Sequence, residues 1–147
     1  MTDRSAIKLA VCEVISSYAV FLDAGEFERV AGLFAEDAVM DISPPPGFME
    51  VPISGRAAIV AALEARYHEV RLTGGRRHVC SNTIFECLSE SSCSTRTFLT
   101  SIATFGDRPP ELLLTGEYAD RLELIDGSWR FIERRLTLDV PGSGAPK

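Results

Sequence analysis

A carboxylate stands near the end of the first apolar segment of the chain. Residues 18–25, Tyr-Ala-Val-Phe-Leu-Asp-Ala-Gly, read as the last turns of a helix with Gly25 as its C-cap, which places Asp23 in the final turn. Because the C-terminal end of a helix carries partial negative charge, an acid there costs roughly a few tenths of a kcal/mol. Asp23 therefore either points into solvent at little cost, or points inward and binds another group.

A histidine that could partner this acid lies near the start of the first long predicted strand. Side chains alternate along a strand, so His78 shares a face with Cys80, Asn82 and Ile84, and neither face is purely apolar. Taken alone, His78 could be a surface residue or a hydrogen-bonded core residue. If it pairs with Asp23, the carboxylate fixes the imidazole tautomer and leaves the other ring nitrogen free as a general base.

Two further side chains could bind a substrate oxygen. Tyr18 lies five residues before Asp23, where it could either pack in the core or donate a hydrogen bond from its phenol. Arg134 shares a strand face with Leu136 and Leu138, and an arginine on an apolar face needs a partner. That partner could be a buried carboxylate, or an anionic or enolate-like group of a ligand.

Other kinds of catalytic site are not indicated. A metal site would need both histidines, His68 and His78, and a carboxylate, yet His68 has no ligand spacing to any other residue. The four cysteines show no C-x-x-C spacing and no basic neighbourhood that would activate a thiol. The glycine-rich motifs that bind nucleotides and the G-x-S-x-G motif are absent. We therefore expect no cofactor and no metal.

The bulk composition narrows the class of protein. The chain has 147 residues, enough for about one domain with a sizeable core, and a formal net charge of −6. Negative charge argues against a nucleic-acid partner, whose phosphates need a basic surface. The sequence shows no signal-peptide pattern and no uninterrupted apolar run of about 18 residues, so we expect no membrane partner. Unpaired cysteines are typical of a cytoplasmic protein with reduced thiols.

Helical signals are confined to the first half of the chain. Apolar spacings of three and four predict a helix over residues 3–23, capped by Thr2 or Asp3. The same spacing predicts a short helix over residues 26–37, and good helix formers after Ser54 predict a third helix over residues 54–70. Between the last two, we expect a brief strand at 38–42 and a proline-rich loop or lid at 43–52.

The second half of the chain has the pattern of an antiparallel meander. Long segments rich in β-branched and aromatic residues are separated by short turn sequences, and they cover residues 76–88, 92–105, 111–125 and 128–140. Helices followed by a long antiparallel sheet indicate an α+β fold. If the sheet curls around the helices, a cone with a pocket at its mouth results.

Four stretches of the chain in combination resemble a known family. They are residues 18–40, GRAAIV at 55–60, RRHVCSN at 76–82 and TGEYADRLELIDGSWRFIERR at 115–135. Together they resemble the SnoaL-like members of the NTF2-like superfamily, over roughly residues 5–138. The resemblance implies a cone-shaped α+β barrel, in which three N-terminal helices pack into a strongly curved antiparallel sheet around one deep apolar pocket. We expect a single domain over residues 1–140 and a flexible tail at 141–147.

Within that superfamily the sequence is similar to a branch with hexachlorocyclohexane dehydrochlorinase, scytalone dehydratase and bile-acid 7α-dehydratase. These enzymes need no cofactor and use an Asp–His pair as their base. The resemblance implies that Asp23 is the acid, that His78 is the base, and that Tyr18 and Arg134 assist them. A second active-site histidine, which one of these dehydratases has, is missing from about residues 95–105. The expected lining of the substrate pocket is Phe48, Met49, Asn82 and Tyr118.

The resulting hypothesis is a cofactor-independent lyase, of the dehydratase type, or an isomerase. It would abstract a proton from carbon of a small apolar cyclic substrate. One alternative is a polyketide cyclase that uses Asp120 or Glu117 as its acid or base. The other is a non-catalytic small-molecule binder or the β subunit of an oxygenase. A homodimer or homotrimer is also expected, because the sheet offers apolar candidates for an interface, namely Phe98, Ile102, Leu112 and Leu114.

Overall fold

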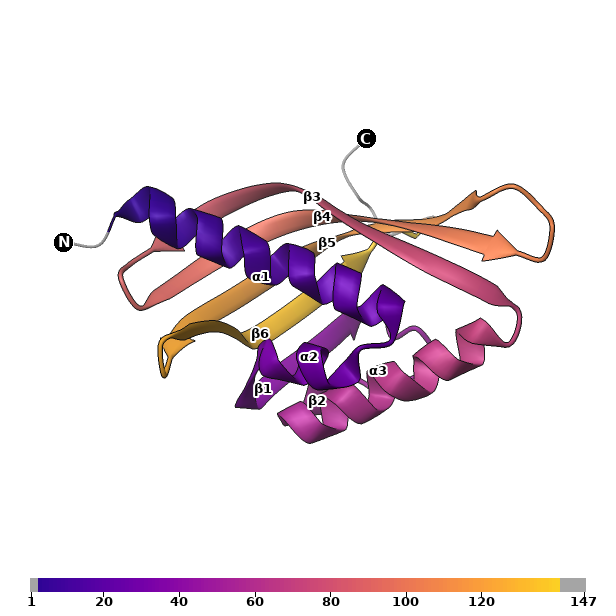
Figure 1. The fold of residues 1–147 in the computed structure, drawn as a ribbon, viewed down its shortest axis with the longest axis horizontal. Coiled ribbons are helices and arrows are strands. Elements are labelled where there is room, and N and C mark those ends of the chain that lie inside the picture. The colour runs from indigo at the N-terminus through magenta and orange to yellow at the C-terminus, as the bar shows by residue number, and fades with distance from the viewer. Residues whose placement is uncertain (1–2, 141–147) are drawn as a thin grey trace.

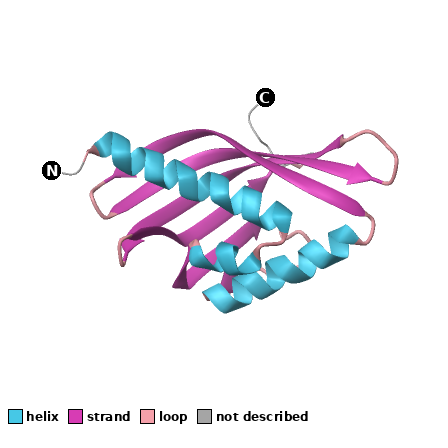
Figure 2. Cartoon of the chain, viewed as in Figure 1, coloured by secondary structure: helices cyan, strands magenta, loops and turns pink. Residues whose placement is uncertain are grey.

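The structure, a computed structural model, describes residues 3–140 and has three helices and six strands. Figure 1 shows their order, and Figure 2 shows all three helices on one side of the sheet. The expected α+β class is therefore confirmed. The expected tail at 141–147 and the alternative cap Thr2 lie outside the described residues. The elements are α1 (Arg4–Ala24), α2 (Phe27–Gly32), β1 (Phe34–Ser43), β2 (Ile53–Ser54), α3 (Arg56–Arg71), β3 (Gly74–Leu88), β4 (Ser92–Phe105), β5 (Glu111–Ile125) and β6 (Ser128–Leu138).

The sheet is mixed and open, with the strand order β2-β1-β6-β5-β4-β3. Strands β3 to β6 form the expected antiparallel meander and curve around α1 (Figure 1). Strand β1, however, runs parallel to β6, so the expectation of a wholly antiparallel sheet was wrong at this edge. The reason is topological, because α3 and the whole meander lie between β1 and β6, and no hairpin turn forces them to run in opposite directions.

Helix α1 has the caps that its sequence predicts. The Asp3 carboxylate accepts a hydrogen bond from the backbone N–H of Ser5, and Gly25 ends the helix in the left-handed region with a φ of 73°. A Cβ at Gly25 would come within 2.8 Å of the Tyr67 ring, so both the backbone and the packing require glycine here. Asp23 consequently lies in the last turn, one residue before the helix ends.

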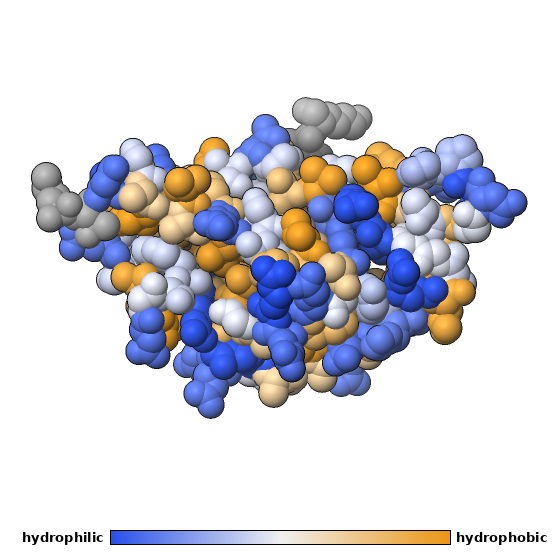
Figure 3. Space-filling view, in the orientation of Figure 1, coloured by the Kyte–Doolittle hydropathy of each residue, from blue (hydrophilic) through white to orange (hydrophobic). Residues whose placement is uncertain are grey.

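One face of α1 is buried against the inner face of the sheet. Its buried residues are Ile7, Val11, Ile15, Tyr18, Ala19 and Leu22. By length and composition alone α1 could cross a membrane, a test that apolar core helices also pass. Its opposite side leaves Leu9 and Val20 exposed, and Figure 3 shows hydrophobic patches among polar residues over this helix.

Helix α2 is shorter than its sequence pattern predicts. The expected helix over 26–37 ends at Gly32, and residue 34 already begins β1. Phe34 pairs with Phe131 of β6 and is fully buried, with the two ring centroids 5.3 Å apart. Burial of two aromatic rings outweighs the weak helical preference of this segment.

Helix α3 begins at Arg56, two residues after the start of the expected range 54–70. Gly55, not Ser54, is its N-cap residue, because Ser54 pairs with Val39 in the short strand β2.

The outer side of the sheet bears some of the apolar residues expected at an interface. Phe98 and Leu112 are exposed and Ile102 is half-buried, whereas Leu114 lines the inner cavity. The homodimer or homotrimer stays a prediction.

Candidate active site

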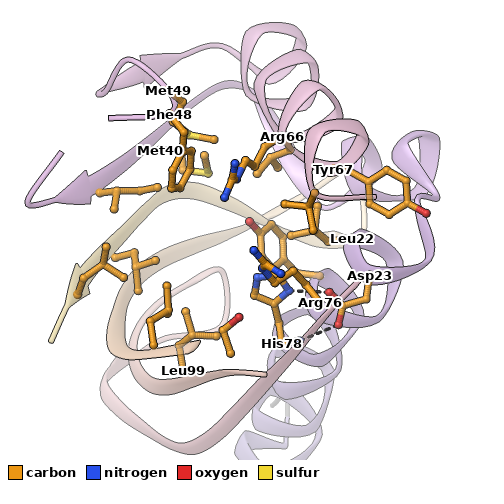
Figure 4. Close-up of a pocket in the computed structure, with 18 of the residues that line it drawn as sticks. Leu22, Asp23, Met40, Phe48, Met49, Arg66, Tyr67, Arg76, His78 and Leu99 are labelled. Atoms are coloured by element: carbon orange, nitrogen blue, oxygen red, sulfur yellow. Dashed lines mark hydrogen bonds and ion pairs between the residues drawn. The ribbon is translucent and has the colours of Figure 1, made fainter. Parts of the chain in front are cut away.

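A cavity of about 150 Å³ lies between the helices, the loop after β1 and the concave face of the sheet. An apolar cavity of this size holds a molecule as large as benzene. Figure 4 shows its walls, to which α1, α3 and five strands contribute side chains. The wall is largely aliphatic, with Leu22, Met40, Leu63, Leu99 and Leu136 among its residues. Polar side chains are few, so their placement determines the chemistry that the cavity can support.

Asp23 and His78 meet in this cavity. The Asp23 Oδ1 atom lies 2.6 Å from Nδ1 of His78, and its Oδ2 accepts the backbone N–H of the same histidine at 2.7 Å (Figure 4). Hydrogen bonds to a charged group contribute about 1.5–3 kcal/mol each, more than the helix dipole costs Asp23. The acid at the end of α1 therefore points inward and holds the first part of β3 against the helix.

The contact with Asp23 determines which nitrogen of the neutral imidazole carries the proton. Because Asp23 accepts at Nδ1, that nitrogen carries the proton and Nε2 keeps its lone pair. No residue between 3 and 140 forms a hydrogen bond with Nε2. The exposed fractions of the two side chains are 21% for His78 and 9% for Asp23, so the imidazole is reachable while the carboxylate is sheltered. Chemically, this pair can accept a proton from a molecule in the cavity.

Arg134 lies at the bottom of the same cavity and has no exposed surface. Its Cζ atom is 3.6 Å from the ring centroid of Tyr118 and 4.2 Å from that of Tyr18. Its Nε lies 3.4 Å from Oδ1 of Asp120, a fully buried carboxylate. The partner of Arg134 is thus an acid on the neighbouring strand, one of the two possibilities that the sequence left open. Within residues 3–140, its guanidinium nitrogens have no hydrogen-bond partner, and because they are fully buried, Arg134 acts on the cavity through its charge and not through direct contact with a ligand.

The two tyrosines are neutral hydrogen-bond donors. Burial raises the pKa of Tyr18 to about 12, although the positive charge of Arg134 partly opposes this, and burial also raises the pKa of Tyr118. Both phenols line the cavity, with their ring centroids 6.3 Å apart in an edge-on arrangement. Tyr18 is therefore both a core residue and a residue of the cavity wall.

The residues of the cyclase alternative lie elsewhere. Asp120 does not line the cavity, and burial raises its pKa to about 6 while the charge of Arg134 opposes that shift. Glu117 likewise does not line the cavity; its carboxylate bonds to Arg96 at 2.6 Å on the exposed side of the sheet.

Three of the four residues expected in the pocket wall line it. Phe48 and Met49 of the proline-rich loop contribute to one side, and Tyr118 contributes from β5. Asn82 does not line the cavity: it is exposed, with a φ of 58°, at an irregularity where the register of β3 with β4 shifts. Strict alternation from His78 would place Asn82 on the same face of β3 as His78, but the irregularity interrupts that alternation.

Several residues that line the cavity were not predicted from the sequence. Arg66 and Tyr67 come from α3, Arg76 precedes His78 by two residues on β3, and Ser101 faces His78 across the strand pair. The alternation along β3 could have identified Arg76, because it shares the face of His78. His68 was the residue of α3 considered as a ligand, and it is exposed beside Glu64 at 3.7 Å. Among residues 3–140, no three His, Cys, Asp or Glu side chains cluster as metal ligands.

Comparisons with known proteins agree with this architecture. A structure from Novosphingobium aromaticivorans, provisionally named a scytalone dehydratase, has a TM-score of 0.77 and 27% identity, covering 95% of this chain and 89% of its own. ActVI-ORFA from Streptomyces coelicolor has a TM-score of 0.78 and 24% identity, covering 91% and 98%. An NTF2-like protein with a cystatin-like fold from Novosphingobium aromaticivorans has a TM-score of 0.79 and 19% identity, covering 94% and 84%.

Sequence comparison defines the family. No curated protein matches the chain. The family model described as the SnoaL-like domain matches residues 3–135, nearly all of the described structure. The open, curved sheet over three helices is the fold shared with the NTF2-like structure above. The chain therefore belongs to the SnoaL-like family.

Proposed function

We propose that the protein is a cofactor-independent lyase or isomerase that removes a proton from carbon of a small, apolar, cyclic substrate. One observation carries the proposal: Asp23 Oδ1 lies 2.6 Å from His78 Nδ1, which leaves the opposite nitrogen of the ring free at a cavity wall. The size and aliphatic lining of the cavity support a compound that places one apolar ring inside it, with any further part of the molecule at the mouth.

In the proposed reaction, His78 is the base. Its Nε2 takes a proton from a carbon next to an electron-withdrawing group, and Asp23 stabilises the imidazolium that results. Asp23 is a positioning residue, because its two contacts with His78 hold the ring in one tautomer and one orientation.

The negative charge that leaves the carbon needs a stabilising group on the other side of the substrate. Tyr18 suits this role because its phenol is neutral and lies next to the Arg134 guanidinium. The positive charge strengthens the phenol as a hydrogen-bond donor, and preorganised donors of this kind usually lower the barrier more than any other contribution. Loss of a leaving group from the adjacent carbon would complete an elimination, and return of the proton to a different carbon would complete an isomerisation.

The comparisons support the general class. The SnoaL-like family contains enzymes, among them polyketide cyclases and dehydratases, and the scytalone dehydratase-like structure shares the fold. The positions of Asp120 and Glu117 outside the cavity favour the Asp23–His78 pair over a cyclase arrangement that uses either acid.

The test measures proton abstraction directly, without knowledge of the natural substrate. Exchange of the acidic C–H protons of 2-tetralone, a bicyclic ketone, is followed by NMR in heavy water. We expect the parent protein to accelerate exchange and His78→Gln to reduce that acceleration about 10²- to 10⁴-fold. The matched control is His68→Gln, because His68 is exposed and away from the cavity. Equal acceleration by the parent and His78→Gln would exclude His78 as the base.

A further inference from the structure

Three arginines surround the cavity on the side nearest α3. Arg66 and Arg71 come from α3, and Arg76 comes from β3, on the strand face that also presents His78. Figure 4 shows the guanidinium groups of Arg66 and Arg76 directed into the cavity from its two sides, between the Phe48 wall and the Asp23–His78 pair. Neither arginine belongs to the proposed proton transfer.

The two inward-facing arginines are close enough to repel each other. Partial burial lowers the pKa of Arg76 from its ordinary value, and the positive charge of Arg66 adds to that shift. Arg76 donates to the backbone carbonyl of Gly75 at 3.1 Å and lies over the Phe105 ring, and no carboxylate of residues 3–140 forms an ion pair with it. A half-buried cation with a like charge beside it is costly unless an anion joins them.

Nearby acids leave Arg76 without an ion-pair partner within residues 3–140 and pair with Arg66 only at the surface. Glu69 pairs with Arg66 at 2.8 Å, but the Glu69 side chain is 60% exposed. Solvent screens an ion pair of this kind, so it offsets little of the positive charge inside the cavity. The two acids of the cavity wall already have other partners: Asp23 is hydrogen-bonded to His78, and Asp41 pairs with Arg135 at 3.2 Å. The mouth of the cavity is therefore cationic, in a chain whose net charge is −6.

We propose that Arg66 and Arg76 bind an anionic group, a carboxylate or a phosphate, that is carried by the apolar substrate itself. The inference deepens the proposed function and rests on it, because the apolar part of the ligand must occupy the cavity beside His78. Arginine suits both anions, since its planar fork matches two oxygens at once. Arg71, exposed beside the Tyr67 ring, adds positive charge at the outer rim.

The strand places Arg76 and His78 as neighbours on one face. They are two residues apart on β3, which separates their Cα atoms by about 7 Å. A cyclic compound with an acidic C–H at one end and an anionic group at the other would therefore face both side chains. Such a substrate would be oriented by charge at the mouth and by shape within the cavity.

The experiment measures binding, so that it is independent of turnover. Calorimetric titration compares 2-naphthoate, 2-naphthyl phosphate and the uncharged 2-naphthamide, three probes with the same ring system. We expect the parent to bind one of the two anions at least about tenfold more tightly than the amide. The tighter anion identifies the group as a carboxylate or a phosphate. This preference should fall as salt is added, while affinity for the amide stays constant.

Two double variants locate the anion site. Arg66→Gln/Arg76→Gln should bind all three probes with similar affinity. The control Arg4→Gln/Arg77→Gln removes the same net charge from exposed positions outside the cavity wall and should keep the preference. If the first double variant does not fold, the single variant Arg76→Gln and the salt dependence of the parent provide the same comparison.

The outcomes separate this inference from the proposed function. Equal affinity of the parent for the anions and the amide, or a preference that persists in Arg66→Gln/Arg76→Gln, would overturn the anion site even if His78 proves to be the base. A preference lost only in that variant would support the anion site even if exchange of 2-tetralone does not depend on His78.

Discussion

Asp23 and Asp120 each pair with a basic side chain of the cavity wall, but the two pairs are built differently. Asp23 forms two short hydrogen bonds with His78, and both side chains keep some exposure. Asp120 and Arg134 are completely buried, are joined by one contact of 3.4 Å, and leave all their polar side-chain atoms without hydrogen bonds within residues 3–140.

This difference gives the two pairs different effects: the Asp23–His78 pair fixes the orientation of a side chain, and the Asp120–Arg134 pair places a charge. A carboxylate that is fully hydrogen-bonded holds its partner in one geometry, which is what a general base needs. A buried pair with unfilled hydrogen bonds contributes little to stability beyond mutual neutralisation, but it places a permanent positive charge beneath two phenols. We infer that the first pair positions the proton acceptor and that the second sets the electrostatic potential where negative charge develops.

The largest effect is expected from the first pair. Asp23→Asn keeps the shape of the side chain and removes its charge, so the His78 tautomer and imidazolium lose their support. We expect proton exchange from 2-tetralone to slow by about 10²- to 10⁴-fold, while the free energy of unfolding stays within about 1 kcal/mol of the parent. Melting curves and exchange rates on the same samples check this. A variant that melts much earlier would identify Asp23 as a structural residue instead.

Breaking the second pair should primarily affect stability. Arg134→Met leaves Asp120 buried without a counter-ion, and we expect a loss of about 3–5 kcal/mol in the free energy of unfolding. The double variant Arg134→Met/Asp120→Leu removes both charges and should recover most of that loss. Denaturant titration measures each variant, with Arg135→Met as the control, because the adjacent arginine is exposed and its ion pairs contribute about 1 kcal/mol or less. If Arg134→Met lost no more unfolding free energy than Arg135→Met, the buried Asp120 carboxyl would not need Arg134 as a counter-ion.

A smaller effect is expected in the pH dependence of stability, because Asp120 titrates and its partner Arg134 does not. Burial raises the pKa of Asp120 from 3.8 to about 6, so the folded state holds a proton that the unfolded state releases as the pH rises between those values. The stability that this group contributes is therefore fully present below pH 3.8 and is lost as the pH passes about 6. A difference of about 2 between the two pKa values corresponds to roughly 3 kcal/mol.

The non-titrating variant Asp120→Asn isolates that contribution. From about pH 4 to about pH 7, we expect the stability of the parent to fall by roughly 2 kcal/mol relative to the variant. Denaturant unfolding of both proteins across this range gives the difference. A constant difference would mean that Arg134 keeps Asp120 ionised in the folded protein throughout.

Local patterns in the sequence determined much of the architecture. Apolar spacing and its two caps define α1, and the Asp126–Gly127 turn, with both φ angles positive, joins β5 to β6 as a hairpin. The helix and the turn depend on neighbours in the sequence, which is why they could be predicted without the fold. The Asp23–His78 contact joins residues 55 apart, and its prediction needed the family resemblance in addition to the two residue types.

The pairing of Asp120 with Arg134 was decided by the tertiary structure. From the Asp126–Gly127 turn, an uninterrupted register would place Asp120 opposite Glu133, as the observed pair Leu124–Trp129 indicates. An irregularity between Arg121 and Leu122 shifts the register by one residue, so Asp120 faces Arg134. The shift brings an acid opposite a base within the buried layer, and a turn sequence carries no information about it.

The cationic mouth and the parallel strand β1 also depend on contacts between distant segments. Arg66 and Arg76 approach each other only because α3 packs across the end of β3, and the α2 boundary moves because Phe34 is buried against Phe131. Single-residue preferences of a fraction of a kcal/mol could not predict these outcomes, since burial of an aromatic ring contributes several times more. The sequence alone thus determined most of the helices and strands and the two residue types of the Asp23–His78 pair, whereas packing between distant elements decided which charged side chains meet.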